Sequence, residues 1–396
     1  MPDLQISQEF QKSKGFTMNI KDIRITPLRL ETKVPYVWSQ GAENAFTVNL
    51  IEIEAEDGTV GYGETTAAPD ADAQKIVLKK LARSYLGRSV FDCTAAQDDA
   101  YRKNFLVFGG NMQRYANQLF CGLEMAALDL QGKLLDRPVW ELLGGEKRKE
   151  VGYFYFLQGQ STEELAADAR AGADAGHPII YLKVGISPEY DLANIKAVRK
   201  AIGDEHRLRL DANEGWSPAH ALRMIQAIEP YKVEYIEQPT TSLSLLPLKH
   251  LKERSPIALG ADQSVFTIQE VYQACATGAA DMIAVGPREI GGLRGMMKAS
   301  AICEGAGLTL CIHSSMTSGI TTCAEHHIGR AVANLDDGNQ IMWQLLKDNV
   351  LASPSLEPQK GKLSLEGRPG LGFELDHDVI AKAAERHRAY ACQQAD

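Results

Sequence analysis

The sequence predicts an α/β fold in which a barrel of parallel strands follows a smaller β-then-α block. Two observations indicate this. The chain has 396 residues, more than one typical core of about 100 to 200 residues, and it suits two domains of which one is a barrel of roughly 250 residues. Beyond residue 151, short β-rich runs alternate with amphipathic helical stretches about every 25 residues, the length of one βα unit.

The first block begins as an antiparallel sheet. Residues 1–17 are expected to form a flexible extension, because apolar and polar residues begin to alternate only at Met18. A second alternating run covers residues 46–54. The pair Asp57-Gly58 then predicts a tight hairpin turn into a third strand over residues 60–64.

Helices complete this block. Apolar residues take helical spacing from about residue 72 to residue 143, and Pro138 and Gly144-Gly145 mark where the helical pattern stops. The sequence therefore predicts an α+β N-terminal domain over residues 18–145.

The barrel is expected over residues 146–350. Its eight predicted strands cover residues 151–156, 179–183, 208–211, 233–237, 257–262, 282–285, 308–313 and a poorly marked segment near Ile341. Residues 351–396 form a C-terminal segment in which a predicted strand and turn lead back to the first domain.

Composition excludes several classes of protein. Apolar residues make up 44% and charged residues 23% of the chain, as in ordinary globular proteins. The net charge is −9 and no basic tract gathers, so nucleic acid is not expected as a partner. No apolar run of about 18 residues and no apolar signal segment occur, which predicts a cytoplasmic protein without membrane contact. The seven scattered cysteines indicate reduced thiols.

Charged residues end five of the predicted strands. They are Lys183, Asp211, Glu237, Asp262 and His313. The carboxyl ends of neighbouring barrel strands surround one mouth, so these side chains are expected to converge. Acidic residues after strands also serve as helix N-caps. For Asp211, Glu237 or Asp262 taken singly, an N-cap is as good an interpretation as a metal ligand. Three carboxylates in register with adjacent strands instead favour a bound Mg²⁺, which takes oxygen ligands and offsets their repulsion.

At this point the chain resembles a known family, the mandelate racemase and muconate lactonising branch of the enolase superfamily. The resemblance covers residues 18–376 and is carried by motifs in a fixed order: Gly132-Lys133 to Gly144-Gly145, Leu210 to Trp216 (LDANEGW), Tyr235 to Pro239 (YIEQP), Gly260 to Ser264 (GADQS) and Gly291-Gly292. It implies a modified TIM barrel of the (β/α)₇β type, with an N-terminal capping domain that the C-terminal tail completes.

The resemblance also implies a chemistry. Mg²⁺ would be held by Asp211, Glu237 and Asp262, and would bind a small carboxylate substrate whose α-proton a base removes, as the superfamily does. Homo-oligomers are frequent in the family, so self-association is expected.

Three positions depart from the family pattern. Tyr181 stands where many relatives have the first lysine of a Lys-x-Lys pair, which leaves Lys183 as the expected base. Gly286 aligns with a second catalytic lysine or with an aspartate that pairs with histidine, so a two-lysine epimerase is disfavoured. Gln263 replaces a frequent glutamate beside Asp262, a change that can alter hydrogen bonds around the ligand.

His313 is similar in place to the histidine of the family's sugar-acid dehydratases and racemases. A lone histidine is more often structural, but its position at a strand end in the mouth favours catalysis. Arg288 and Glu289 either hold the substrate or orient His313, or they form a surface ion pair. His326 and His327 are expected to be structural.

Substrate contacts are expected from both domains. Tyr36 and Trp38, within the stretch 34–41, would form aromatic walls over the mouth, or else anchor the capping sheet. Tyr181, Asn213 and Arg288 are further candidates for contacts with the substrate.

These residues favour a Mg²⁺-dependent dehydratase of an acid sugar or related hydroxy acid, with Lys183 as base and His313 as acid. A cycloisomerase or lactonising enzyme needs only Lys183. A racemase or epimerase would use Lys183 and His313 on opposite faces of the substrate. The alternative from a different functional class is a metal-binding barrel protein that catalyses no reaction.

Overall fold

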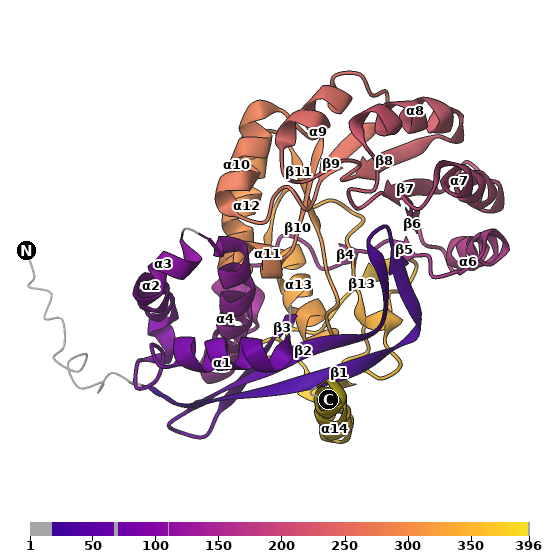
Figure 1. Cartoon of the computed structure of the whole chain (residues 1–396). Coiled ribbons are helices and arrows are strands. Elements are labelled where there is room, and N and C mark those ends of the chain that lie inside the picture. Colours follow the sequence, from indigo (N-terminus) through magenta and orange to yellow (C-terminus); the bar gives the residue numbers. More distant parts are fainter. Residues whose placement is uncertain (1–17, 67–69, 110, 395–396) are drawn as a thin grey trace, which may run out of the picture.

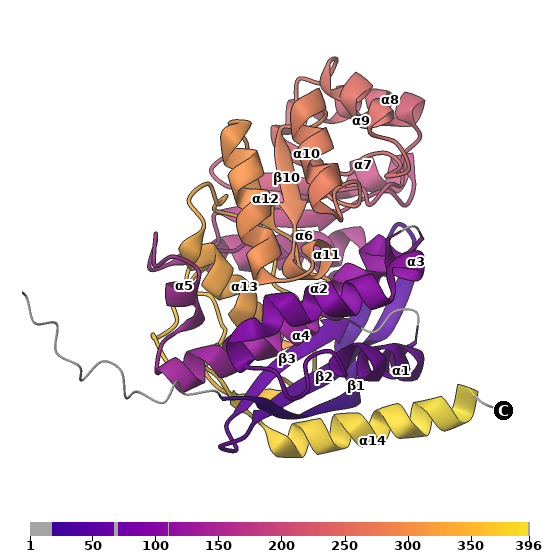
Figure 2. The same cartoon turned by 90° about the vertical axis from the view of Figure 1, so that its left-hand side faces the viewer.

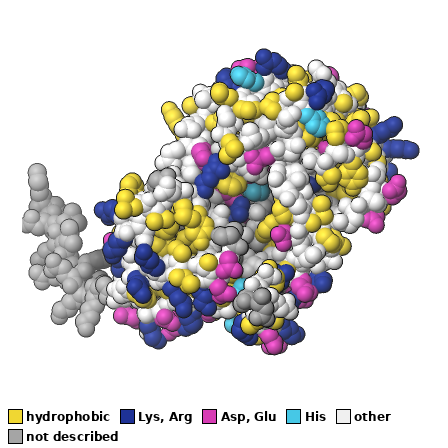
Figure 3. Space-filling view, in the orientation of Figure 1, with side chains coloured by type: hydrophobic (Ala, Val, Ile, Leu, Met, Phe, Trp, Pro, Cys, Tyr) yellow, Lys and Arg dark blue, Asp and Glu magenta, His cyan; other side chains and the backbone are white. Residues whose placement is uncertain are grey.

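Figure 1 shows the computed structural model of the chain, which describes residues 18–66, 70–109 and 111–394. A barrel with its outer helices packs against a smaller sheet-and-helix domain that contains the first part of the chain. The predicted extension over residues 1–17 lies outside the described residues. None of the described helices is long and apolar enough to cross a membrane. Acidic and basic side chains are interspersed on the face shown in Figure 3.

The capping domain contains a three-stranded antiparallel sheet in the order β1-β2-β3. The strands are β1 (Ile20–Trp38), β2 (Gly41–Ala55) and β3 (Val60–Thr66). The predicted turn at Asp57-Gly58 joins β2 to β3, and Gly58 has the positive φ of 88° that favours glycine. The stretch 34–41, which carries the predicted aromatic walls, is the tip of the long β1-β2 hairpin.

Helices α1 (Ala71–Ala82) and α4 (Gln113–Leu135) pack on this sheet. The shorter helices α2 (Cys93–Lys103), α3 (Phe105–Phe108) and α5 (Val139–Leu142) pack against α4. The longest, α4, lies directly on β3 because the strand presents glycines there. A Cβ atom on Gly63 would lie 2.3 Å from the carbonyl oxygen of Gly122, so only glycine permits this approach.

Seven parallel strands form the barrel sheet in the order β11-β10-β9-β8-β7-β6-β5. They are β5 (Tyr155–Phe156), β6 (Ile179–Lys183), β7 (Arg207–Asp211), β8 (Val233–Glu237), β9 (Ala258–Ala261), β10 (Met282–Val285) and β11 (Thr309–Ile312). The outer helices are α6 (Thr162–Asp174), α7 (Pro188–Ile202), α8 (Pro218–Ile228), α9 (Leu245–Lys252), α10 (Ile268–Thr277), α11 (Pro287–Ile290), α12 (Leu293–Gly305) and α13 (Gly319–Ala331). The modified TIM barrel is thus confirmed.

The eighth predicted strand, near Ile341, is not a regular strand. Its position in the ring is taken by two extended residues, Asn339 and Gln340. The Gln340 N–H donates to the carbonyl of Ile312 (2.9 Å) on one side, and the Phe154 N–H donates to the carbonyl of Asn339 (3.1 Å) on the other. These two backbone hydrogen bonds close the barrel, but they are too few to define a regular strand.

The tail reaches the capping domain by a helix. The strand predicted within the C-terminal segment is the short β13 (Lys362–Leu363), which pairs with β4 (Val151–Gly152) of the barrel. A second short pair joins β12 (Leu351–Ser353) to β14 (Glu374–Leu375). The final helix, α14 (His377–Gln394), then lies along the capping sheet in Figure 2, where His387 Nε2 is 3.0 Å from Asp72 Oδ2.

Candidate active site

The strand register brings the predicted site residues to one end of the barrel. Lys183 on β6 is paired with Asp211 on β7, and Asp211 is paired with Glu237 on β8. Asp262 directly follows β9 and His313 directly follows β11. All three carboxylates are buried. Four strands, β7 to β10, separate Lys183 from His313 in the sheet, so the carboxylates form an arc between a lysine at one end and a histidine at the other.

Lys183 is held by two neighbours from β7 and its loop. Its Nζ lies 2.5 Å from Asp211 Oδ2 and 2.6 Å from Asn213 Oδ1. The Asn213 N–H in turn donates to Asp211 Oδ1 at 2.8 Å. Burial alone would lower the pKa of the Lys183 ammonium, but the carboxylates of Asp211 and Glu237 outweigh burial and raise it. In this arrangement the lysine neutralises part of the carboxylate arc.

Tyr181 faces the same carboxylates. Its ring is buried against Phe154, with centroids 4.1 Å apart, and its hydroxyl lies 2.7 Å from Asp211 Oδ2 and 3.1 Å from Glu237 Oε1. Tyr235 donates a further short hydrogen bond to Glu237. Tyr181 is predicted from the sequence to contact the substrate. In the structure its hydroxyl points to the carboxylate oxygens of Asp211 and Glu237.

The acidic residues fit a divalent cation. Ligand atoms of Glu237, Asp262 and His313 lie within 4.8 Å of one another. Asp262 Oδ1 is buried without a hydrogen-bond partner among the described residues. Burial, together with repulsion from the neighbouring carboxylates, raises the pKa of both Glu237 and Asp262. A cluster of buried oxygens that lacks enough positive charge is the donor set that Mg²⁺ takes.

This close group differs from the predicted ligand set of Asp211, Glu237 and Asp262. His313 Nδ1 lies 3.2 Å from Asp262 Oδ1, whereas Asp211 is engaged by Lys183 and Tyr181. Gln263, the departure from the family pattern, donates a short hydrogen bond to Asp262. It therefore orients the carboxylate directly.

His313 has an acidic neighbour of its own. Glu289 Oε1 lies 3.7 Å from His313 Nδ1, and Glu289 is buried, so the pair with Arg288 is not a surface ion pair. The Arg288 Nε donates to Glu289 Oε1 at 2.6 Å. Burial lowers the pKa of His313 to about 4. Arg288, predicted to contact the substrate, is thus engaged by Glu289.

Gly286 explains how Glu289 comes to lie there. The Gly286 N–H donates to Glu289 Oε2 at 3.0 Å. A Cβ atom at position 286 would lie 2.8 Å from that oxygen and 2.1 Å from the carbonyl oxygen of His313. The position at which relatives carry a second base therefore has no room for a side chain, and the Glu289 carboxylate lies beside it. The sequence identifies Glu289 as a candidate residue, but it does not indicate that the Glu289 carboxylate lies beside position 286.

The hairpin tip of the capping domain covers the mouth. The Tyr36 ring is 5.1 Å from the ring of Trp38 and 6.0 Å from Lys183 Nζ. Ser39 Oγ donates to the carbonyl of Asn213 at 2.8 Å. Tyr36 and Trp38 thus lie at the junction of the two domains. The sequence does not identify Ser39 as a site residue, because its contact with Asn213 spans 174 positions of sequence and forms only in the folded chain.

Together, the capping domain, the parallel barrel and the carboxylate arc at the strand ends define a barrel enzyme of the enolase type. Residues 20–144 match the mandelate racemase / muconate lactonizing enzyme N-terminal domain, and residues 164–379 match the enolase C-terminal domain-like family. The chain belongs to the mandelate racemase and muconate lactonizing branch of the enolase superfamily.

Its relatives carry out different reactions. The chain is 26% identical to the hydrophobic dipeptide epimerase of Enterococcus faecalis, over 89% of this chain and 96% of that one. It is 27% identical to the arabinonate dehydratase of Saccharolobus solfataricus, over 86% of this chain and 91% of that one. The solved muconate lactonizing enzyme from Pseudomonas fluorescens, in complex with muconolactone, superimposes with a TM-score of 0.86 at 28% identity, over 93% and 99% of the two chains. These relatives share the family and differ in the reaction for which they are named.

Proposed function

We propose that this protein is a Mg²⁺-dependent dehydratase. It removes the proton α to the carboxylate of a hydroxy acid and expels the β-hydroxyl as water. Lys183 and His313 stand at the two ends of the carboxylate arc and supply the two groups that this reaction needs, a base and an acid.

Asp211, Glu237 and Asp262 would hold the cation. When bound, Mg²⁺ supplies positive charge that stabilises the negative charge which builds up on the substrate carboxylate as the α-proton leaves. The three carboxylates are buried, Lys183 offsets only part of their charge, and Asp262 Oδ1 has no hydrogen-bond partner among the described residues, which supports this assignment.

Lys183 and His313 carry out different proton transfers. Lys183 Nζ, positioned by Asn213 Oδ1 at 2.6 Å, takes the α-proton from C2 as a neutral amine. A bound Mg²⁺ would offset the carboxylates that raise the pKa of Lys183 and would so favour that neutral form. His313 then gives a proton to the hydroxyl on C3, the C3–O bond breaks, and water leaves. The remaining enol takes a proton at C3 and becomes a 2-oxo acid. The Glu289 carboxylate, 3.7 Å from His313 Nδ1, favours the imidazolium form electrostatically and so opposes the burial that lowers the pKa of His313 to about 4.

One observation carries the choice of dehydration: opposite Lys183 stands a histidine and not a second lysine. Position 286 has no room for another base, because a Cβ atom there would lie 2.1 Å from the His313 carbonyl oxygen. A group that can donate a proton suits departure of a hydroxyl, which is a poor leaving group without protonation.

Racemisation or epimerisation is the second candidate. It uses the same two residues, each exchanging a proton with one face of C2. The location of Lys183 and His313 on strands far apart in the ring, and the likeness to an epimerase, favour this alternative.

The experiment compares two variants on a panel of 2,3-dihydroxy acids in D₂O with Mg²⁺. We expect Lys183→Met to lose both α-proton exchange and 2-oxo acid formation. We expect His313→Asn to keep exchange while product formation falls by about 10²-fold or more. Lys347→Met and His250→Asn, at exposed positions outside the site, are the matched controls.

Three results would overturn the proposal. Exchange at the wild-type rate in Lys183→Met would place the base elsewhere. Equal loss of exchange and product in His313→Asn would favour the racemase. Inversion at C2 without 2-oxo acid would replace dehydration by epimerisation.

A further inference from the structure

We infer that the hairpin tip of the capping domain (residues 34–41) positions the base of the barrel, and that Ser39 and Gln40 are the positioning residues. They act through the backbone carbonyl of Asn213, whose side chain contacts Lys183. The inference rests on the proposed function for the role of Lys183 as base. It gives the capping domain a part in proton removal that is separate from covering the mouth.

Asn213 connects three parts of the site. Its side-chain Oδ1 accepts from Lys183 Nζ at 2.6 Å, and its N–H donates to Asp211 Oδ1 at 2.8 Å. Its carbonyl accepts from Ser39 Oγ at 2.8 Å and from Gln40 Nε2 at 3.2 Å. Among the described residues, these two side chains are the only donors to that carbonyl, so the capping domain satisfies a polar group that the barrel leaves open.

The peptide between Asn213 and Glu214 is held from both sides. Its carbonyl faces the hairpin tip, and its N–H, which belongs to Glu214, donates to the carbonyl of Gln238 at 2.8 Å. Asn213 and Glu214 both have a positive φ, 39° and 66°, a conformation that residues other than glycine keep mainly where surrounding contacts hold them. The two donors from the hairpin tip are among these contacts. Without them the peptide can turn, and the side chain that contacts Lys183 moves with it.

The barrel provides a seat for Ser39 beside Lys183. Gly185, two residues beyond Lys183, has a positive φ of 97°, and a Cβ atom there would lie 3.1 Å from the Ser39 Cβ. Ser39 thus packs against the loop after β6 while it donates to the loop after β7. The hairpin tip therefore contacts both chain segments that set the distance between Lys183 Nζ and Asn213 Oδ1.

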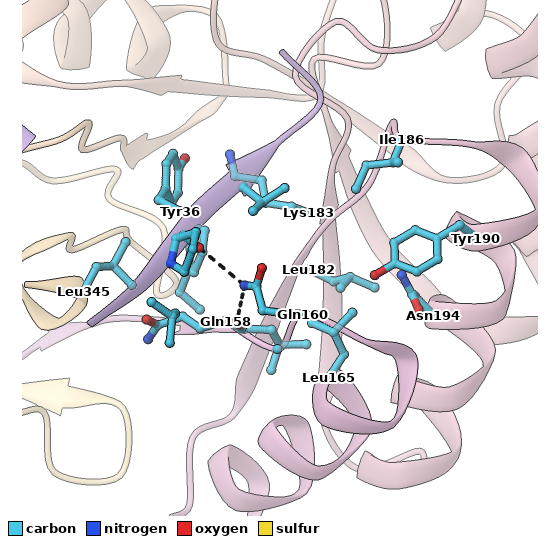
Figure 4. Close-up of a pocket in the computed structure, with 16 residues that line it drawn as sticks. Tyr36, Gln158, Gln160, Leu165, Leu182, Lys183, Ile186, Tyr190, Asn194 and Leu345 are labelled. Atoms are coloured by element: carbon cyan, nitrogen blue, oxygen red, sulfur yellow. Dashed lines mark hydrogen bonds between the residues drawn. The ribbon is translucent and has the colours of Figure 1, made fainter. Parts of the chain in front are cut away.

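A second contact joins the hairpin tip to the barrel without reaching Asn213. Gln160 Nε2 donates to the carbonyl of Pro35 at 3.3 Å and to that of Gln158 at 3.0 Å, as Figure 4 shows. Loss of this contact loosens the hairpin tip but removes no donor from the Asn213 carbonyl. A variant of Gln160 therefore separates docking of the hairpin tip in general from the particular hydrogen bonds to that carbonyl.

The first measurement needs no substrate. The double variant Ser39→Ala, Gln40→Ala removes both donors, Ser39→Thr retains the hydroxyl, and Gln160→Met breaks the second contact. In the full chain labelled with ¹⁵N-lysine, the Nζ resonance of Lys183, assigned by its loss in Lys183→Met, reports whether the ammonium stays hydrogen-bonded. We expect the double variant to shift and broaden this resonance. The other two variants should keep it as in the wild type.

The second measurement is α-proton exchange in D₂O with Mg²⁺ on the panel of 2,3-dihydroxy acids. A base displaced by about 1 Å can lower a rate by about 10²-fold, whereas Ser39 and Gln40 bond to the protein backbone and not to the substrate. We therefore expect the double variant to lower kcat for exchange by about tenfold or more, with KM within about twofold of the wild type. Ser39→Thr should restore kcat, and Gln160→Met should retain it.

The outcomes separate this inference from the proposed function. An unchanged Lys183 resonance in the double variant would overturn the inference, and so would an equal change in Gln160→Met. A rise in KM at constant kcat would also overturn it, because Ser39 and Gln40 would then act on substrate binding. Absence of exchange from every acid, together with the expected changes in the resonance, would keep the control of Lys183 by the hairpin tip and overturn the proposed function.

Discussion

The Tyr181 hydroxyl lies 2.7 Å from Asp211 Oδ2 and donates a hydrogen bond to it. The same hydroxyl is 3.1 Å from Glu237 Oε1, so one buried tyrosine orients two proposed ligands. Groups that orient metal ligands commonly change metal affinity by about 10- to 100-fold when removed. We expect Tyr181→Phe to weaken Mg²⁺ or Mn²⁺ binding by about tenfold, measured by calorimetry without substrate.

Tyr153→Phe is the control for this change. Tyr153 is also buried beside β5, but its hydroxyl lies 3.3 Å from His326 and makes no contact with the carboxylates. Its removal should leave cation affinity unchanged. An equal loss in both variants would mean that the barrel interior, and not the hydrogen bond to Asp211, determines affinity.

Cation binding should also stabilise the fold. Glu237 and Asp262 are buried close together, and a cation relieves their repulsion in the native state only. A ligand at 100 times its Kd stabilises a protein by about 2.7 kcal/mol. We expect Mg²⁺ to raise Tm of the wild type, and Asp262→Asn to abolish most of that rise. Glu205→Gln, which removes a carboxylate at an exposed position outside the site, should keep the full Mg²⁺ response.

Much of the barrel could be predicted because the information is local. Lys183, Asp211 and Glu237 each end an apolar run, and the βα spacing alone places them side by side, as the strand register confirms. The extended residues at Asn339 and Gln340 carry no such run, so their place in the ring follows only from pairing with Ile312 and Phe154.

The finer features of the site depend on tertiary contacts. Tyr181 could be identified as a departure from the family, but its partners follow from the inward direction of its ring on β6. Gly286 could be identified as a missing base, but the backbone of His313 is what excludes a side chain there. Residues 34–41 carry aromatic rings, yet their role as a hairpin tip depends on pairing between β1 and β2.

The two domains are joined by a helix cap that crosses between them. Glu64 Oε1 on β3 accepts hydrogen bonds from the N–H groups of Ser318 (3.0 Å) and Thr321 (2.9 Å) at the start of α13. Loss of a helix cap costs about 1 kcal/mol, and two buried donors would lose their partner here. We expect Glu64→Ala to lower the free energy of unfolding by about 2 kcal/mol in urea titrations.

Glu64→Gln retains an acceptor oxygen and should lose less stability than Glu64→Ala. Glu205→Ala, at an exposed glutamate, should change stability little. Equal values for the alanine and glutamine variants would show that the carboxylate charge at the helix N-terminus matters more than the hydrogen bonds.

His327 should make the fold sensitive to acid. Its Nδ1 accepts the Trp140 N–H at 3.1 Å, and burial lowers its pKa to about 3. The unfolded chain binds this proton below about pH 6.5 and the native state does not, so the free energy of unfolding falls as the pH drops from about 6.5 toward 3, by up to about 1.4 kcal/mol per unit. His327→Gln keeps an acceptor without titrating, and should lose stability less steeply between pH 7 and pH 5 in urea titrations. His250→Gln, at an exposed position, should retain the wild-type slope; an unchanged slope in His327→Gln would assign the acid sensitivity to other groups.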